Sequence, residues 1–144
     1  MEGTLTVTPG EVADFIRRAV REFRDNPLLN LSSLAYAGMV IASIGFVKNH
    51  DALKLLGDLV SDAPDKLRNL ISLRYSVLGT LGEVQAILSD VTDDAIRRIT
   101  RILLEVADMF EKGSLNDSRL LHVIGELYEL LAVKLPSVAT PNTE

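Results

Sequence analysis

LLNLSSLAYAGMVIASIGFV, residues 28–47, carries no charged side chain along twenty positions. Asn26 and Pro27 precede it: an Asn side chain can accept a hydrogen bond from a first-turn amide, and Pro fits the first helical position because the N–H that it lacks has no partner there. The polar residues NHD at 49–51 follow it. We therefore predict a helix over about residues 27–48 that is apolar on every side. Such a helix belongs in a protein core, in an oligomer interface or in a bilayer.

Small residues recur within this helix at steps of three and four, so they share one face. They are Ala35, Gly38, Ala42 and Gly45. A face made of small residues lets the backbone of a second helix approach closely. We predict that this face is a helix–helix interface.

A membrane-spanning segment is the main alternative, because about 20 apolar residues can cross a hydrocarbon layer. Asn30 and three serines interrupt the run, and its two glycines lower its hydropathy further. Basic residues stand on both flanks, at Arg24 and Lys48, so they indicate no orientation across a membrane. The helices that follow are patterned for a bundle that faces water. These features favour a buried helix of a soluble protein.

The segment before the apolar run has a clear helix start. Thr8-Pro9-Gly10-Glu11 is a capping box with Pro at the first helical position. It predicts a helix that runs to about Asp25. The apolar side of this helix consists of Val12, Ile16, Ala19, Val20 and Phe23.

Two helix starts are predicted after the apolar run. Asp51 can cap a short helix, and residues 61–64, SDAP, restart the chain with a proline that opens the next helix. Apolar residues keep a helical period from there to about Ser89. Gly79 and Gly82 predict a bend or break within this helix, because each costs about 1 kcal/mol relative to Ala.

The clearest amphipathic helix follows. Thr92-Asp93-Asp94 predicts its start, with acidic residues at its positive end, and Gly113 ends it in the C′ position. Ser114 or Asn116 then starts a last helix, which continues until Pro136. The inward residues of these two helices are Ile96, Ile99, Leu103, Val106 and Phe110, and then Leu120, Ile124, Leu127, Leu131 and Leu135.

These elements predict an all-α fold. We expect an antiparallel bundle of five or six helices, with short connections, around the central apolar helix at about residues 27–48. Residues 1–8 form an N-terminal arm, residues 9–135 form a single helical domain, and residues 136–144 form a C-terminal tail.

The composition favours self-association. The chain has 144 residues, a net charge of −5 and no cysteine, so disulfides and thiolate metal sites are excluded. Hydrophobic residues make up 47% of it and the mean hydropathy is +0.21, which is high for a lone acidic domain of this size. We expect part of this apolar surface to lie outside the core, and exposed apolar patches mark association surfaces. No secretory leader is seen, so we expect a cytoplasmic location or an intracellularly assembled particle.

Arginines recur in two similar segments of the form DxIRRxxR, which begin at Asp14 and Asp94. The first and third arginines of each segment lie on one helix face, and the candidate binding residues for an anion or a protein partner are Arg17, Arg21, Arg24, Arg97 and Arg101. Such a row can bind phosphate or carboxylate groups. The favoured interpretation is that these are solvated faces paired with nearby acids. A carboxylate-rich partner and nucleic acid remain alternatives.

No pattern in the sequence indicates catalysis. His50 and His122 are the only histidines, and they lie on different predicted elements without metal-ligand spacing. A Gly-rich phosphate loop, a G-x-S-x-G elbow and a cysteine nucleophile are absent from the sequence. We therefore expect no enzyme activity, no cofactor, no metal and no small-molecule substrate.

The leading hypothesis from the sequence is a non-enzymatic, self-associating structural or scaffold subunit, such as a coat, shell or assembly component. It would use the apolar helix and one outer helix as interfaces. The alternative is a small helical subunit of a nucleoprotein complex that contacts phosphates through the arginines. A membrane-associated helical protein is the second alternative.

Overall fold

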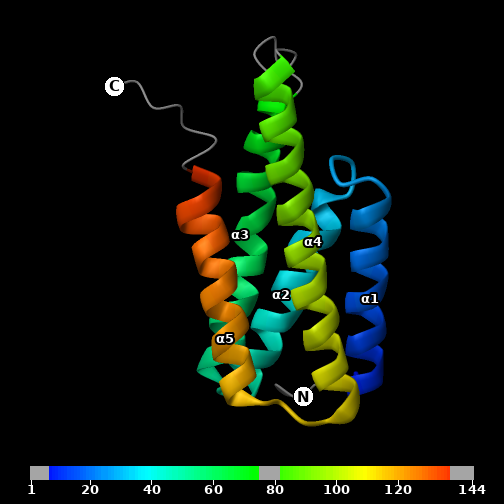
Figure 1. Ribbon diagram of the computed structural model, residues 1–144. Coiled ribbons are helices and arrows are strands. Elements are labelled where there is room, and N and C mark those ends of the chain that lie inside the picture. The colour runs from blue at the N-terminus through cyan, green and yellow to red at the C-terminus, as the bar shows by residue number, and fades with distance from the viewer. Residues whose placement is uncertain (1–6, 75–81, 137–144) are drawn as a thin grey trace.

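The computed structural model describes residues 7–74 and 82–136, and every regular element within them is helical. The predicted all-α bundle is thereby confirmed. Its elements are α1 (Pro9–Asp25), α2 (Leu31–Val47), α3 (Asp51–Arg74), α4 (Gly82–Lys112), α5 (Asp117–Tyr128) and a π-helical segment η2 (Glu129–Lys134). The helices lie side by side along one long axis (Figure 1). Most of the predicted arm and tail, and the predicted bend at Gly79, fall outside the described residues.

Helix α1 begins and ends as predicted. The Thr8 backbone N–H donates to Glu11 Oε1 at 2.8 Å, and the Glu11 N–H donates to Thr8 Oγ1 at 3.1 Å. This reciprocal pair satisfies two backbone donors that a helix start leaves free. The predicted apolar side of α1 is buried in the core.

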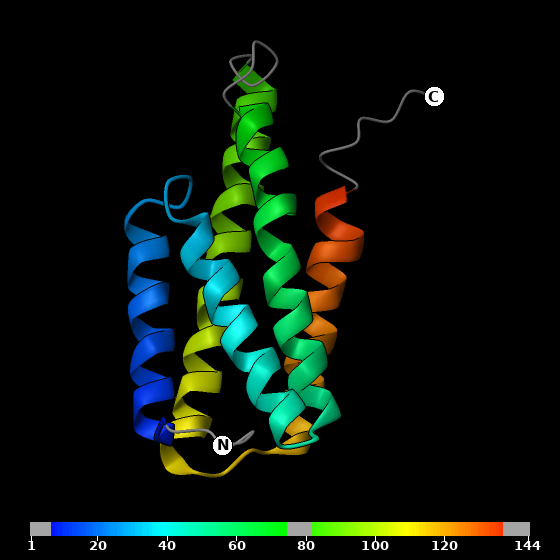
Figure 2. The same cartoon turned by 180° about the vertical axis from the view of Figure 1, so that it is seen from behind.

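Helices α2 and α3 form a closely packed antiparallel pair (Figure 2). A Cβ atom added at Gly38 would lie 2.5 Å from the backbone nitrogen of Ser61, and one added at Gly45 would lie 2.5 Å from that of Lys54. On the facing helix, a Cβ atom at Gly57 would lie 2.6 Å from the Cα atom of Ala42. The backbones meet at a distance that only glycine permits at these positions.

The central position predicted for α2 is not confirmed. Helix α2 packs mainly on α3 and also on α1, whereas α3 contacts α2, α4, α5 and η2. In Figure 2, α2 lies at the front of the bundle, between α1 and α3. Because α2 has no polar face, its sequence could not indicate which side turns inward.

The predicted start of α2 at Asn26-Pro27 is also wrong. Asn26 caps the end of α1 through its backbone N–H, which donates to the carbonyl oxygen of Glu22 at 3.3 Å. Its side-chain oxygen accepts from the Leu29 N–H at 3.2 Å, which closes a turn over residues 27–30. Helix α2 therefore begins at Leu31.

Two predicted boundaries lie inside longer helices. Pro64 lies within α3 and is buried. Its neighbours Ala63 and Leu67 belong to the hydrophobic core. A proline in a helix interior costs about 3 kcal/mol, so core packing on both sides of it must hold the helix together. Thr92 is buried inside α4, and its hydroxyl donates to the Leu88 carbonyl at 2.6 Å instead of capping a helix. Helix α4 starts ten residues earlier, at Gly82.

The connection from α4 to α5 follows the prediction. Gly113 adopts φ +68°, the left-handed conformation that terminates helices, and Asn116 accepts from the Arg119 N–H at 3.0 Å as the cap of α5. The predicted inward residues of both helices are buried, apart from Ile96, which is partly buried at the edge of the core.

Candidate interaction surfaces

The five arginines singled out in the sequence all line one groove. Helices α1 and α4 pack side by side, and two neighbouring hollows lie between them, with Arg24 and Leu104 lining both. Arg17 and Arg21 line one hollow, and Arg97 and Arg101 line the other. Two segments that begin eighty residues apart are therefore brought together by the fold.

Three of these arginines already have carboxylate partners. Arg17 on α1 contacts Glu111 at 2.5 Å and Asp108 at 3.2 Å on α4, and these contacts raise its pKa. Arg101 pairs with Glu126 on α5. The Arg97 guanidinium lies 2.6 Å from Asp94.

Asp94 is the centre of a larger ion-pair cluster that joins α4 to η2. Besides Arg97, its carboxylate contacts Arg98 at 3.0 Å and Lys134 at 3.1 Å. Partial burial raises the pKa of Asp94, but the hydrogen bond from Lys134 and the charges of Arg98, Lys134 and Arg97 outweigh this effect, so the pKa is lowered.

An aspartate three residues before an arginine forms an ion pair on both helices. Asp94 contacts Arg97 on α4, and Asp14 contacts Arg17 on α1 at 3.8 Å. The repeated DxIRRxxR pattern thus includes an aspartate–arginine pair on each helix.

A further ion pair ties α4 to α5. Arg119 binds Glu105 through both Nε and Nη2. The hydrogen bond from Arg119 holds the pKa of Glu105 below its ordinary value, against the opposing effect of burial. Helical spacing alone does not indicate this pair, because the two residues lie on different helices, fourteen positions apart.

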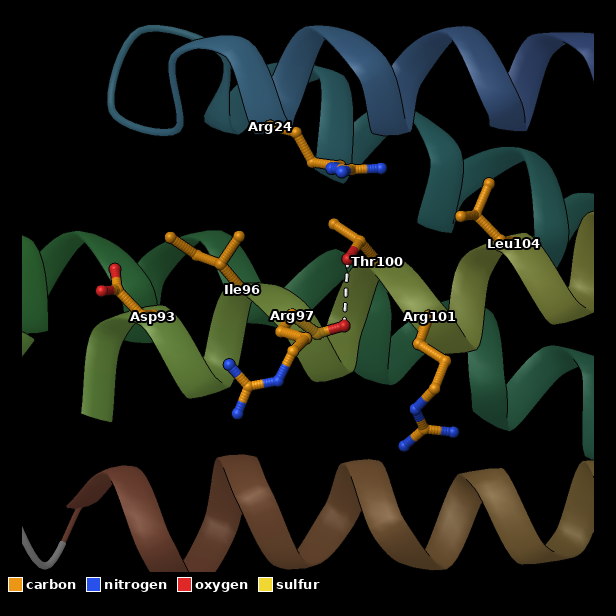
Figure 3. Close-up of a pocket in the computed structure, with 7 residues that line it drawn as sticks. All are labelled: Arg24, Asp93, Ile96, Arg97, Thr100, Arg101 and Leu104. Atoms are coloured by element: carbon orange, nitrogen blue, oxygen red, sulfur yellow. Dashed lines mark hydrogen bonds between the residues drawn. The ribbon is translucent and has the colours of Figure 1, made fainter. Parts of the chain in front are cut away.

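The groove retains little free positive charge. Within the described residues, Arg21 and Arg24 make no ion pair, but Asp25 and Asp93 line the same hollows. Figure 3 shows Arg24 between α1 and α4, while Arg97 and Arg101 extend from α4 toward α5. The arrangement fits a solvated, ion-paired face better than a dedicated phosphate site.

The outer side of α2 presents a different kind of surface. Tyr36, Met39 and Phe46 are 57%, 54% and 75% exposed, and Ser32 and Ser43 continue their row at steps of three and four. We call these five residues the α2 stripe. No charged residue occurs anywhere in α2. A helix face that looks outward in a folded chain is normally polar, so the α2 stripe is an unusual surface for a helix in water.

A hollow lies beside the α2 stripe. Its lining includes Ser43 and Phe46 of the stripe together with their neighbours Ala42 and Val47, and Lys54 and Asp58 of α3 form its polar edge. The α2 stripe therefore combines protruding apolar side chains with a recess of mixed character. Such a combination is typical of surfaces that bind another protein.

The helix α5 has a second exposed apolar row on its outer side. Leu121 and Tyr128 are 61% and 57% exposed, Gly125 stands between them, and Val133 of η2 is exposed beyond them. We call these four residues the α5 stripe. Both α2 and α5 pack on α3, so the two stripes belong to different helices on either flank of that helix.

The predicted interface residues of α2 contact the protein itself. Gly38 and Gly45 are buried against α3, Ala42 contacts Gly57, and Ala35 is partly buried. The small-residue face therefore builds the α2–α3 pair, and the free surface of α2 is the α2 stripe. The sequence predicted a helix that is apolar on every side, but it did not indicate that Tyr36, Met39 and Phe46 would be the exposed residues.

The two histidines lie at different elements, His50 just before α3 and His122 on α5. His50 Nδ1 accepts from the Leu53 N–H at 3.2 Å at the start of α3, and its Nε2 lies 3.2 Å from Asp117 Oδ1. In the described part of the chain, no three His, Asp or Glu side chains are grouped so as to hold a metal ion. Over the same residues, none of the helices has both the length and the apolar character needed to cross a bilayer.

Comparison with known proteins does not assign the chain to a family. The chain matches no family model, no curated protein and no solved structure.

Proposed function

We propose that this protein is a non-enzymatic structural subunit that associates with further copies of itself through the α2 stripe. The observation that carries the proposal is the exposure of Tyr36, Met39 and Phe46 on a helix without any charge. Removing such side chains from water is the main favourable contribution to protein association. A second copy supplies a surface of the same apolar character.

The expected affinity is moderate. Burying a large apolar side chain completely contributes about 1.5–3 kcal/mol, so three side chains from each copy contribute about 9–18 kcal/mol before any cost. Association costs about 4–15 kcal/mol in lost motion, and partial burial reduces the gain. A dissociation constant of micromolar order requires a net gain of about 8 kcal/mol, which lies within the range that these figures allow.

The α5 stripe extends the proposal beyond a pair of copies. A subunit with one self-complementary surface forms a closed dimer, whereas a subunit with two separate surfaces can form a larger assembly. Leu121 and Tyr128 supply the second surface. This matches a structural or scaffold component that uses α2 and one outer helix.

Self-association is better supported than a phosphate-binding role for the arginine groove. Arg17, Arg97 and Arg101 are occupied by acids of the same chain. A phosphate would have to compete with those carboxylates and would meet Asp25 and Asp93 in the same hollows.

Light scattering coupled to size-exclusion chromatography tests the proposal with the unmodified chain. The mass is expected to rise above the monomer value of 15.8 kDa as the protein concentration increases through the micromolar range. A mass that stays at the monomer value up to submillimolar concentration would overturn the proposal.

A further inference from the structure

The α2 stripe has a symmetric arrangement of large and small side chains about Met39. Met39 is the middle residue of α2, which runs from Leu31 to Val47. Tyr36 lies three residues before it and Ser43 four residues after it, while Ser32 and Phe46 each lie seven residues away. Phe46 thus has a serine at the equivalent position on the other side of Met39, and Tyr36 has one within a single residue of its equivalent position.

We infer that two copies pack with their α2 helices antiparallel and with Met39 on the two-fold axis between them. This inference rests on the proposed self-association and assigns its geometry. A two-fold axis places residue i against residue j and j against i. It sets Phe46 over Ser32 of the second copy, and it sets Tyr36 within one residue of the level of Ser43 of the second copy. At both ends of the interface, a large side chain of one copy then occupies the space above a serine of the other copy.

A parallel pairing lacks this fit. It would set Tyr36 against Tyr36 of the second copy and Phe46 against Phe46. Ser32 and Ser43 would likewise each face the equivalent serine of the second copy. Large side chains would crowd at some levels and voids would remain at others, and both defects destabilise packed helices. Methionine suits the axis position because its flexible side chain adapts to a copy of itself.

The charges at the two ends of α2 favour the same direction. Lys48 caps the C-terminal end, and Glu22 lies beside the N-terminal end, where it accepts a hydrogen bond from Ser33 Oγ at 2.8 Å. The antiparallel register brings the Lys48 end of each helix to the Glu22 end of the other copy. It also sets opposite ends of the two helix dipoles beside each other. In a parallel pairing the two Lys48 side chains would approach one another.

The absence of cysteine from the chain allows a direct test by disulfide crosslinking. Met39→Cys places a single thiol next to the axis. Phe46→Cys places it about 21 Å from its equivalent in the antiparallel pair, since fourteen residues separate the two levels at about 1.5 Å each. A disulfide requires Cα atoms within about 7 Å. Ile87→Cys, at an exposed position of α4, measures crosslinking by random collision.

With oxidised glutathione as the oxidant, Met39→Cys is expected to form a covalent dimer at least about tenfold faster than Phe46→Cys or Ile87→Cys. Equal or faster crosslinking of Phe46→Cys would overturn the antiparallel geometry but leave self-association standing. If Met39→Cys reacts no faster than Ile87→Cys while the unmodified chain still associates in light scattering, the geometry fails alone. If the unmodified chain is also monomeric, the proposed function fails with it.

Discussion

Gly57→Ala is expected to lower the free energy of unfolding by about 3 kcal/mol, at the upper end of the usual cost of overpacking. The added methyl group would lie 2.6 Å from both the Cα and the Cβ atom of Ala42. Real Cβ atoms essentially never come this close, and the atoms in the way include backbone of α2. The clash can be removed only if the α2 and α3 backbones move apart, and this movement weakens the core contacts along both helices. Urea unfolding followed by circular dichroism measures the change.

Gly125→Ala is the matched control for this prediction. Gly125 also lies inside a helix, but no heavy atom lies within 4 Å of an added Cβ atom. Without a clash, the lower entropy of the unfolded chain is expected to raise the free energy of unfolding by about 0.5–1 kcal/mol. Effects of the same sign and size for Gly57→Ala and Gly125→Ala would contradict the close packing of α2 on α3.

Paired substitution of Tyr36→Glu and Phe46→Glu is expected to abolish self-association at concentrations where the unmodified chain associates. Both side chains are exposed in the single chain, so the fold should persist. The two substitutions remove four apolar side chains from a pair of copies, and at about 1.5 kcal/mol each this loss weakens association about 10,000-fold. The introduced carboxylates add the cost of burying charge. Sedimentation velocity measures the change in mass.

Ile87→Glu is the control for that experiment, because Ile87 is an apolar residue on another helix and is as exposed as Tyr36. It should leave association unchanged. Tyr128→Glu, in the α5 stripe, should leave pairs intact and remove only larger species. Association that survives Tyr36→Glu and Phe46→Glu together would show that the α2 stripe is not the contact surface.

Sequence reasoning located the elements with local capping chemistry. The Thr8–Glu11 capping box, Gly113 and the Asn116 cap all depend on residues a few positions apart, so their effect does not need the rest of the fold. The internal boundaries at Pro64 and Thr92 were wrong because packing of the surrounding core residues continued the helix through a local stop or start signal.

The candidate surfaces were only partly predictable. The arginine rows could be found from helical spacing, but their partners Glu111 and Glu126 come from distant parts of the chain, which sequence spacing does not bring together. The orientation of α2 was hidden for another reason. An apolar helix gives the same pattern on every side, so only the position of α3 decides that Gly38 is covered and Met39 is exposed.

The methionine methyl groups provide the most direct measurement of the central claim, that copies associate through the α2 stripe. The chain has three methionines, among which Met39 is exposed in the middle of the stripe and Met109 is buried in the core. In NMR spectra of chain labelled at these methyl groups, the Met39 signal is expected to shift or broaden as the concentration rises through the micromolar range, while the Met109 signal stays constant. A Met39 signal that does not change with concentration would contradict the account.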